Sequence, residues 1–303
     1  MNNISIIIPT YNRSKILLKT LKALENQNYP KSNYEVIIAD DGSSDDTNLQ
    51  IEKFQSKTDL KIKYFKLNHV SSCHARNTAI SNTKYELILT IDDDIITTAN
   101  FIEEHVRFHK DCNFKKDVGV LGYTVWPPEW RVSSFMKYVI EKGPLYSYGL
   151  IKNELDLPFS YLYTSNFSIN KAFLLENGML DERFPKYFED TELGYRLKKK
   201  GLKIFLNKKA VAYHYHPTSI LSFMKRQELA GFYAVVFYLK HQELKNFLLP
   251  SDNKDTFWKD LVFEKLFKFK RISILDIKDK FYCDLIRYSY NNGLKKGLNS
   301  FKK

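Results

Sequence analysis

Cysteine is scarce in this chain: 303 residues include 3 cysteines, the scattered Cys73, Cys112 and Cys283. No Cys-x-x-Cys pair and no cysteine–histidine spacing typical of zinc ligands accompanies them. This pattern excludes a zinc site built on cysteine and a disulfide framework. An odd, scattered set is typical of a reducing compartment, so we expect a cytoplasmic location.

Long hydrophobic runs are also missing. The best apolar stretch, residues 231–239, is far shorter than the ~20 residues that a membrane-spanning helix needs. The first residues, MNNISIIIPTYN, have neither a basic stretch nor a long apolar one, so they lack the pattern of a signal peptide. The sequence contains no recognisable nucleic-acid-binding motif, and we expect no nucleic acid partner.

The charge of the chain is unbalanced toward positive. The net charge is +12, and residues 251–303 contain 13 lysines and arginines against 7 acidic residues, which is half of the excess. A basic tail of this kind attracts anionic lipid or phosphorylated substrates, or it serves only as a solubilising surface. We interpret residues 217–303 as a helical, basic C-terminal extension.

The first half of the chain alternates predicted strands and helices. A mostly parallel α/β sheet with helices on both faces is the expected result. Ser14 is a plausible N-cap of the first helix. Strands are expected at 4–8, 34–39, 62–67 and 85–91, and helices at 14–27, up to about residue 54, and at 72–81.

The second half is less regular. A helix is expected at 189–201, because its acidic start, basic end and terminal Gly201 suit the helix dipole and a helix stop. A long helical pattern at 219–249 leads into the basic tail. Strands are expected around 118–125, 161–169, 202–206 and 210–215.

Polar clusters follow several predicted strands, where α/β sheets bind their ligands. Asp92 and Asp94 end the apolar run LTI, and carboxylate oxygens suit Mg²⁺ or Mn²⁺. The alternative is a solvated acidic turn or a helix N-cap, since the segment after Asp94 looks helical. Asp40 and Asp41 end another strand, where a carboxylate accepts a uracil N–H or else starts an Asx turn before Gly42.

These motifs together resemble family 2 glycosyltransferases of the GT-A fold, a Rossmann-like architecture. The ordered stretches that carry the resemblance are IIIPTYNR, VIIADDGSSDDT, HARNTAI, LTIDDDI, SNFSINKAFLLENGMLDERF and FEDTELGYRLKKKGLKI. The resemblance spans roughly residues 4–216. It implies a catalytic domain at 1–216, with a nucleotide-binding half at about 1–98 and an acceptor half at about 99–216.

The same resemblance implies an inverting transfer of sugar from a nucleotide-sugar, with UDP favoured, in the presence of Mn²⁺ or Mg²⁺. Asp94 is then the direct metal ligand, with Asp92 beside it and with His214 as a further metal or phosphate contact or a structural residue. Arg76 faces the diphosphate, or in isolation forms a surface ion pair. The remaining expected donor-site residues are Pro9, Thr10, Asn12, Arg13, Asp40 or Asp41, Asp93 and Asn166.

Glu189 and Asp190 match the family's Glu-Asp motif, whose aspartate is the expected catalytic base. An acceptor hydroxyl that attacks the anomeric carbon must lose a proton, and a nearby carboxylate can accept it. The alternative role of both residues is N-terminal helix capping, worth ~1 kcal/mol.

Two other functions stay open from the residues alone. One is a sugar-phosphate nucleotidyltransferase, and the other is a non-catalytic basic module that binds nucleic acid or membrane. The expected acceptor is a hydroxyl of a saccharide, lipid-linked or protein-linked glycan. The extension either packs on the protein or makes a peripheral contact with the inner face of the cell membrane. Trp126 and Trp130 either stack on an acceptor sugar or pack in the core.

Overall fold

The chain forms two units in the computed structural model, which describes residues 3–249 and 279–301. The first unit comprises Met1–Arg131 and Leu150–His216, and the second comprises Val132–Gly149 and Pro217–Lys303. Residues 132–149 thus belong with the C-terminal helices, although we expected them in the acceptor half. The part of the predicted extension at 250–278 lies outside the described residues.

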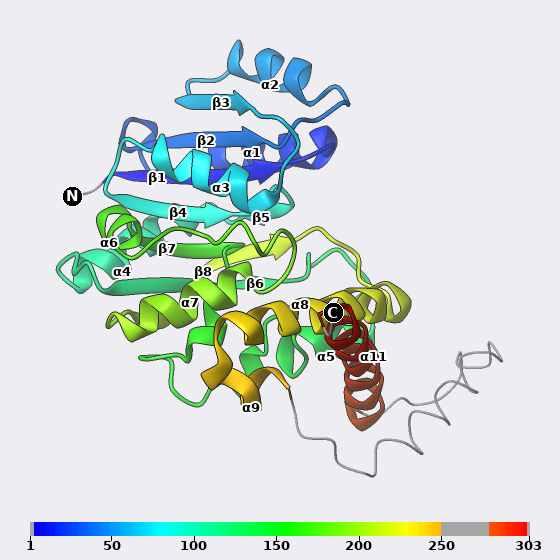
Figure 1. Ribbon diagram of the computed structural model, residues 1–303. Coiled ribbons are helices and arrows are strands. Elements are labelled where there is room, and N and C mark those ends of the chain that lie inside the picture. The colour runs from blue at the N-terminus through cyan, green and yellow to red at the C-terminus, as the bar shows by residue number, and fades with distance from the viewer. Residues whose placement is uncertain (1–2, 250–278, 302–303) are drawn as a thin grey trace. The chain divides into compact units, whose positions relative to one another are not determined.

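The first unit is built on an eight-stranded sheet of order β3-β2-β1-β4-β7-β6-β8-β5 (Figure 1). The ladders β3/β2, β2/β1, β1/β4 and β6/β8 are parallel, whereas β7 pairs antiparallel with β4 and β6, and β5 with β8. The mostly parallel α/β sheet is therefore confirmed. The strands are Ile4–Thr10, Tyr34–Asp40, Ile62–Lys66, Leu87–Ile91, Ile95–Thr97, Val118–Val125, Asn166–Asn170 and Lys203–His214, for β1 to β8.

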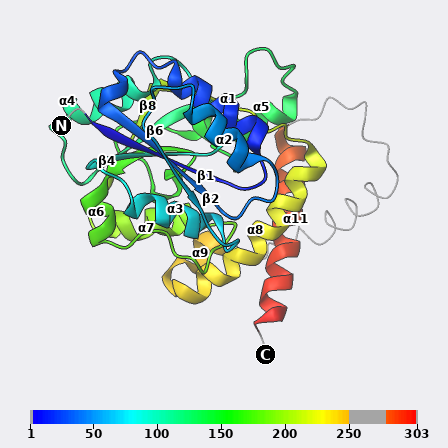
Figure 2. The ribbon, with the colours of Figure 1, turned by 90° about the horizontal axis from the view of Figure 1, so that it is seen from above.

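Helices cover both faces of this sheet, as expected. Figure 2 shows α1 and α2 on one side of the strands and α3 and α7 on the other. The helices of this unit are α1 (Ser14–Glu25), α2 (Thr47–Gln55), α3 (Ser72–Ser81), α4 (Phe101–Asp111), α6 (Lys171–Glu176) and α7 (Glu189–Lys199).

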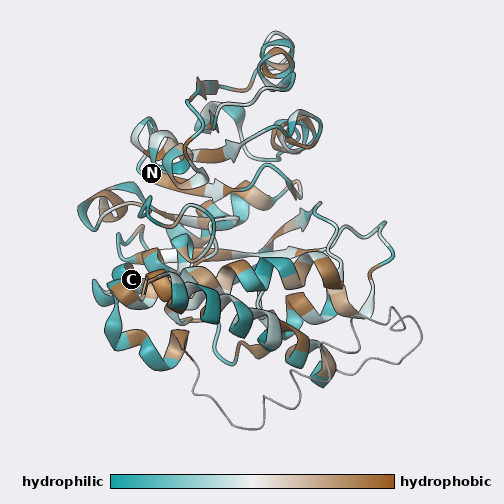
Figure 3. Cartoon of the chain, turned by 45° about the vertical axis from the view of Figure 1, so that its right-hand side comes forward, coloured by the Kyte–Doolittle hydropathy of each residue, from teal (hydrophilic) through white to brown (hydrophobic). Residues whose placement is uncertain are grey.

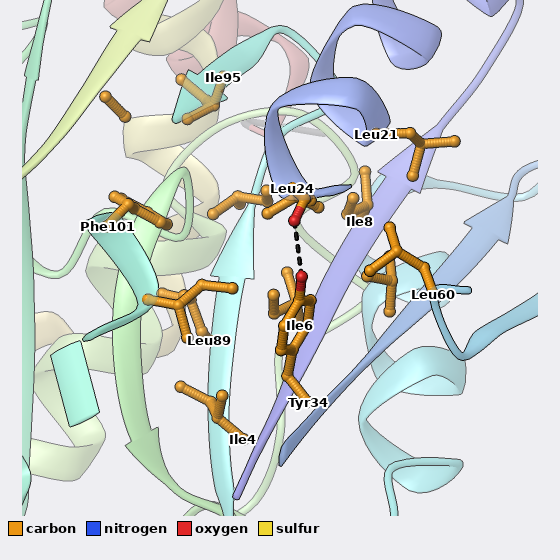
Figure 4. Packing of buried hydrophobic residues seen from close by; sticks show 14 of the residues in the cluster. Ile4, Ile6, Ile8, Leu21, Leu24, Tyr34, Leu60, Leu89, Ile95 and Phe101 are labelled. Carbon is orange, nitrogen blue, oxygen red and sulfur yellow. Dashed lines mark hydrogen bonds between the residues drawn. The ribbon is translucent and has the colours of Figure 1, made fainter. Parts of the chain in front are cut away.

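The core forms because β1 is buried on both faces. Alternate side chains of a strand point to opposite faces, and Ile4, Ile6 and Ile8 pack in one cluster with Leu21 and Leu24 of α1. Figure 4 shows this packing, in which the Tyr34 hydroxyl donates a hydrogen bond to the Leu24 carbonyl over 2.7 Å. The packed β1 and α1 fix the position of the loop between them, which carries Thr10 to Arg13.

Four local predictions are wrong. Ser14 is the first helical residue instead of the N-cap, and its hydroxyl donates to Asp46 Oδ1 (2.6 Å). The segment after Asp94 is strand β5, because Ile95–Thr97 pairs with the end of β8. The two strands expected at 202–215 are one strand, whose pairing with β6 shifts register after Gly122. Strand β7 begins at Asn166, and Phe159–Tyr161 is a 3₁₀ helix.

The second unit is helical. It contains α5 (Ser134–Glu141), α8 (Ile220–Lys240), α9 (Lys245–Leu248) and α11 (Asp279–Ser300). Ser219 caps α8 in a capping box with Ser222, and the predicted helix at 219–249 ends at Lys240, before a 3₁₀ turn and α9. The helices carry both hydrophilic and hydrophobic residues (Figure 3). Among residues 3–249 and 279–301, no helix combines the length and the apolar character needed to cross a membrane.

Candidate active site

A cavity of about 450 Å³ lies in the first unit, where β1, β2 and β4 end. Because these strands are parallel, the polar residues that follow them meet at one edge of the sheet. The cavity is lined by Pro9, Thr10, Tyr11, Arg13, Asp41, His69, Val70, Ser71, Ser72, Arg76, Asp92, Asp93, Pro185, Lys186 and Tyr187. Seven of these residues are among those expected from the sequence: Pro9, Thr10, Arg13, Asp41, Arg76, Asp92 and Asp93.

The three adjacent carboxylates after β4 each have a basic partner. Arg76 Nη2 donates a short hydrogen bond to Asp92. Arg13 bridges the other two, with Nη1 3.0 Å from Asp93 Oδ1 and Nη2 2.6 Å from Asp94 Oδ2. Burial raises the pKa of Asp93 to about 7, against the opposing charge of Arg13. The arginines, and partial protonation of Asp93 near neutral pH, therefore relieve much of the repulsion among these neighbours.

Asp94 is held between two histidines from the end of β8. Its Oδ1 lies 3.6 Å from His214 Nε2, and its Oδ2 lies 3.4 Å from His216 Nδ1. Burial alone would raise the pKa of Asp94, but the hydrogen bond from His216 and the charges of His214 and Arg13 hold it well below its ordinary value. Asp94 is therefore an anion at neutral pH, and Oδ1 has no hydrogen-bond partner among the described residues.

Arg76 lies beneath the cavity on α3, whose first turn is capped by the Ser71 side chain. Burial lowers the pKa of the guanidinium, but the charges of Asp92 and Glu189 raise it by more than burial lowers it. The net shift is upward, so the group is a permanent cation. Among the described residues its Nε and Nη1 atoms are buried without a hydrogen-bond partner. Buried donors of this kind are costly unless a ligand satisfies them, and a guanidinium matches the oxygens of a phosphate.

The side of the cavity beyond β2 is built by Asp41 and His69. Asp41 accepts a hydrogen bond from the Val70 N–H (2.8 Å), and its Oδ2 lies 3.1 Å from His69 Nδ1. The imidazole of His69 stacks on Tyr11, with ring centroids 4.2 Å apart. Sequence reasoning missed both rings as site residues, although Tyr11 stands inside the quoted PTYNR motif.

Two of the expected nucleotide contacts also make hydrogen bonds that hold the fold together. Asp40 is fully buried and accepts hydrogen bonds from the Tyr64 hydroxyl (2.6 Å) and the Ser43 N–H (2.8 Å). Asn12 adopts a positive φ of 53° and accepts a hydrogen bond from the Ser44 N–H, which ties its loop to the loop after β2. Neither residue lines the cavity, so Asp41 is the carboxylate at this end of the site.

Asn166, expected near the donor sugar, has its side chain inside the fold. It is fully buried, accepts a hydrogen bond from His105 Nε2 (2.9 Å) and donates to Thr124 Oγ1. His105 and His109 both reach the Ser168 hydroxyl over 2.9 Å. Burial lowers the pKa of His105 to about 3 and that of His109 to about 4, so this network is neutral.

The Glu-Asp pair follows a loop that is anchored to α3. The side chain of Asn77 bonds both the N–H and the carbonyl of Leu180, and the Cys73 thiol donates to the Phe184 carbonyl. The loop places Lys186 and Tyr187 on the cavity, and α7 then starts after Phe188, whose φ is 66°.

Neither acid acts as the predicted N-cap, because Phe188 holds that position and makes no side-chain cap hydrogen bond. Glu189 and Asp190 are half-buried at the first two positions of α7. Burial and the neighbouring Asp190 raise the pKa of Glu189 to about 7, although Arg76 opposes the shift.

The family model described as glycosyl transferase family 2 matches residues 5–176, more than half of the chain. The chain belongs to this family. This family 2 member is therefore a glycosyltransferase, and the nucleotidyltransferase and the non-catalytic module considered above are set aside. The resemblance seen in the strand-end motifs is confirmed.

Similar proteins support the same assignment. The chain is 30% identical over 244 residues to a chondroitin synthase of Pasteurella multocida (strain Pm70), which covers 71% of this chain and 25% of that protein. It is 32% identical over 174 residues to the Staphylococcus aureus (strain Mu50 / ATCC 700699) poly(ribitol-phosphate) beta-N-acetylglucosaminyltransferase TarS, which covers 52% of this chain and 30% of TarS. The family 2 chain thus spans about a quarter to a third of these relatives.

The solved structures share the fold. A Pyrobaculum calidifontis mannosyltransferase in complex with GDP-Man and Mn²⁺ has a TM-score of 0.66 at 14% identity, with 99% of this chain and 88% of that chain covered. TarS residues 1–349 in complex with UDP-GlcNAc has a TM-score of 0.54 at 18% identity, with 98% and 83% covered. At these identities the likeness establishes the GT-A architecture of this family 2 member.

Proposed function

We propose that this glycosyltransferase moves a sugar, with inversion, from a nucleotide-diphosphate sugar to a hydroxyl of a saccharide, lipid-linked or protein-linked glycan. The observation that carries the proposal is the cavity lined by Arg76, which has two buried donors without a partner among the described residues, together with the carboxylates Asp92 and Asp93. A nucleotide diphosphate requires two kinds of group: a cation that binds its phosphate oxygens, here Arg76, and carboxylates that bind its divalent ion, here those that follow β4.

The donor fits the cavity by its chemistry. Asp41 offers a carboxylate to a base N–H or a ribose hydroxyl, beside the stacked rings of Tyr11 and His69. Thr10 and Arg13 line the same cavity as Asp41 and the carboxylates Asp92 and Asp93. A UDP-sugar is favoured, because a carboxylate accepts the N3–H of uracil, and because the relative TarS has been crystallised with UDP-GlcNAc.

An Mg²⁺ or Mn²⁺ ion fits the residues at the acidic edge. Asp94 is ionised and keeps one oxygen without a hydrogen bond, and the side chain of Asp92 is 32% exposed. Among the described residues no group of three or more histidine, cysteine, aspartate or glutamate side chains forms a complete metal site. The proposed ion therefore depends on Asp94 with Asp92 or His214 and on phosphate oxygens of the donor, which would complete its coordination.

The bound ion supplies charge stabilisation for the departing diphosphate. Arg76 adds a fixed cation at the same group, and its buried donors need no reorganisation during the reaction. Asp190 takes the proton of the acceptor hydroxyl as that oxygen attacks the anomeric carbon from the side opposite the nucleotide. The proton of the acceptor is thus taken at the start of α7, whereas the departing diphosphate is stabilised at the end of β4.

The first unit is the proposed catalytic domain, and the acceptor is set by parts of the chain outside the donor cavity. The second unit is proposed to support acceptor binding, with peripheral contact to the inner face of the cell membrane as one way to meet a lipid-linked acceptor. We propose a role in polysaccharide assembly in the cytoplasm, in line with the chondroitin synthase relative.

Calorimetric titration of UDP, GDP, dTDP and CMP, each with Mn²⁺, with Mg²⁺ and with EDTA, tests the donor site. We expect one nucleoside diphosphate to bind, and to bind more weakly in EDTA. Asp94→Ala should remove the difference between Mn²⁺ and EDTA, whereas Asp111→Ala, at the exposed end of α4, should keep it. No binding of any nucleotide would refute the donor site, and unchanged Mn²⁺ dependence in Asp94→Ala would refute the metal assignment.

A further inference from the structure

The loop WPPEW, residues 126–130, lies against the end of β8 in the first unit. The indole of Trp126 stacks on the imidazole of His214, with ring centroids 5.6 Å apart and an interplanar angle of 7°. Trp126 also stacks on Trp130, with centroids 6.3 Å apart. His214 in turn stacks on His216, with ring centroids 5.7 Å apart. Four rings therefore form a connected stack that ends beside Asp94.

The loop itself is held rigidly. Trp126 follows β6 directly, and Pro127 and Pro128 fix two φ angles in a turn closed by the Trp130 N–H and the Pro127 carbonyl (3.0 Å). The edge of Trp130 meets the ring of Tyr215, with centroids 5.4 Å apart. The Tyr215 hydroxyl donates a short hydrogen bond to Glu129. The loop and the strand end are thus joined at three points.

Trp126 is too buried to receive a sugar. It is 7% exposed, so an acceptor ring cannot stack on it without displacing its neighbours. The alternative of core packing, considered for this residue from the sequence, therefore holds for Trp126. Because Trp126 packs against His214, this packing can affect the proposed metal site at Asp94.

The parallel stack fixes the plane of the His214 ring. The imidazole is buried and lies nearly parallel to the indole, so the two rings pack as one layer. In this plane Nε2 points toward Asp94 Oδ1, 3.6 Å away, which is the oxygen without a hydrogen-bond partner among the described residues. The backbone adds a second constraint, since the Tyr215 N–H donates to the Asp94 carbonyl over 2.9 Å.

We propose that Trp126 is a positioning residue, which holds His214 against Asp94 and so sets the strength of metal-dependent nucleotide binding. The inference rests on the proposed donor site. Residues that orient a metal ligand commonly change metal affinity ~10-fold or more when they are replaced. A large, rigid indole at the end of a short, proline-fixed loop suits this role.

The test uses the full chain and its variants Trp126→Leu, Trp126→Phe and Phe205→Leu. Phe205 lies on the same strand as His214 and packs on Phe108, with ring centroids 5.5 Å apart, so its replacement is a matched loss of ring packing far along β8. UDP and GDP are titrated calorimetrically in Mn²⁺ and in EDTA, and thermal unfolding shows that each variant is folded.

We expect Trp126→Leu to weaken nucleotide binding in Mn²⁺ ~10-fold and to leave binding in EDTA unchanged. Trp126→Phe keeps an aromatic face on His214 and should restore most of the Mn²⁺ dependence. Phe205→Leu should lower thermal stability and keep the full Mn²⁺ dependence. If the leucine variant does not fold, Trp126→Met is measured in its place, because a flexible thioether fills the space without fixing the ring plane.

Two outcomes would overturn this inference and leave the proposed function standing. One is a wild-type Mn²⁺ dependence in Trp126→Leu, and the other is an equal loss in Mn²⁺ and EDTA, which is the result of a merely structural role. A wild-type chain that binds nucleotide equally in Mn²⁺ and EDTA would refute the metal part of the proposed function and this inference with it.

Discussion

Glu189 and Asp190 are adjacent carboxyl groups with different surroundings. Burial and the charge of Asp190 raise the pKa of Glu189 to about 7, so Glu189 carries a proton for much of the time near neutral pH. Asp190 Oδ1 accepts a hydrogen bond from the Thr191 N–H over 2.7 Å, a contact that favours the charged form of a carboxylate. Glu189 is therefore poorly suited to accept a proton at neutral pH, and Asp190 remains the proposed base.

We therefore predict that Asp190→Asn lowers kcat by ~10²–10⁴-fold, the usual contribution of a general base. The nucleotide cavity does not include Asp190, so UDP affinity in Mn²⁺ should stay near the wild-type value. Steady-state kinetics with the donor and calorimetry with UDP measure the two quantities. Glu189→Gln is the matched control and should retain more activity. The reverse order of the two variants would move the base to Glu189.

The residues of the cavity differ in how far the sequence reveals them. Asp92 and Arg13 were predictable, because each follows a buried strand and the ends of parallel strands converge. The Tyr11–His69 stack was not, since it joins two loops 58 positions apart and neither ring has a local signal. The contact of the Asn166 amide with His105 on α4 was not predictable either, because strand periodicity does not specify such a partner.

At the scale of elements, the regular βα pattern up to β4 was predicted almost to the residue, because each buried strand has a clear apolar run. Prediction failed where pairing decides the structure: Ile95–Thr97 is a strand only because β8 lies beside it. Residues 132–149 group with the C-terminal helices for the same reason, which the sequence pattern does not indicate. Phe135 of α5 packs on Phe223 of α8 and on Tyr282 of α11, contacts that are remote in sequence.

The packing of α8 on α11 depends on glycines at the points of closest approach. A Cβ at Gly293 would lie 1.8 Å from the Glu228 carbonyl oxygen, and one at Gly231 would lie 2.0 Å from the Tyr290 carbonyl oxygen. Both obstacles are backbone atoms, which cannot rotate away. At Gly297 the nearest atom is a side-chain methyl of Val235, 2.8 Å away.

We predict that Gly293→Ala destabilises the helix pair by ~1–3 kcal/mol, the usual cost of overpacking, although alanine is the better helix former by ~1 kcal/mol. Gly297→Ala is the matched control and should cost less, because the nearest backbone atom there, the Phe232 carbonyl oxygen, lies 3.0 Å from the added Cβ instead of 1.8 Å. Amide hydrogen exchange of α8 and α11 measures the change within the second unit. Equal protection of the two variants would contradict the backbone contact at Gly293.

For the molecule as a whole, buried titratable groups act on stability in opposite directions. The folded pKa values of His105 and His109, about 3 and about 4, lie below their ordinary value of 6.5, so the unfolded chain binds more protons and stability falls as the pH drops below about 6.5. The folded pKa of Asp93, about 7, lies above its ordinary value of 3.8. Its contribution is present at low pH and is lost as the pH rises toward 7.

Replacing one group of each kind should therefore tilt the pH dependence of stability in opposite senses. Between pH 4.5 and 6.5, a range inside both windows, each group changes the slope by up to ~1.4 kcal/mol per pH unit. Relative to wild type, we expect His109→Gln to lose less free energy of unfolding on acidification, and Asp93→Asn to lose more. Urea unfolding at a series of pH values measures the slopes, which are independent of each variant's overall loss of stability. An unchanged slope in either variant would show that the replaced group titrates in the fold as it does in water.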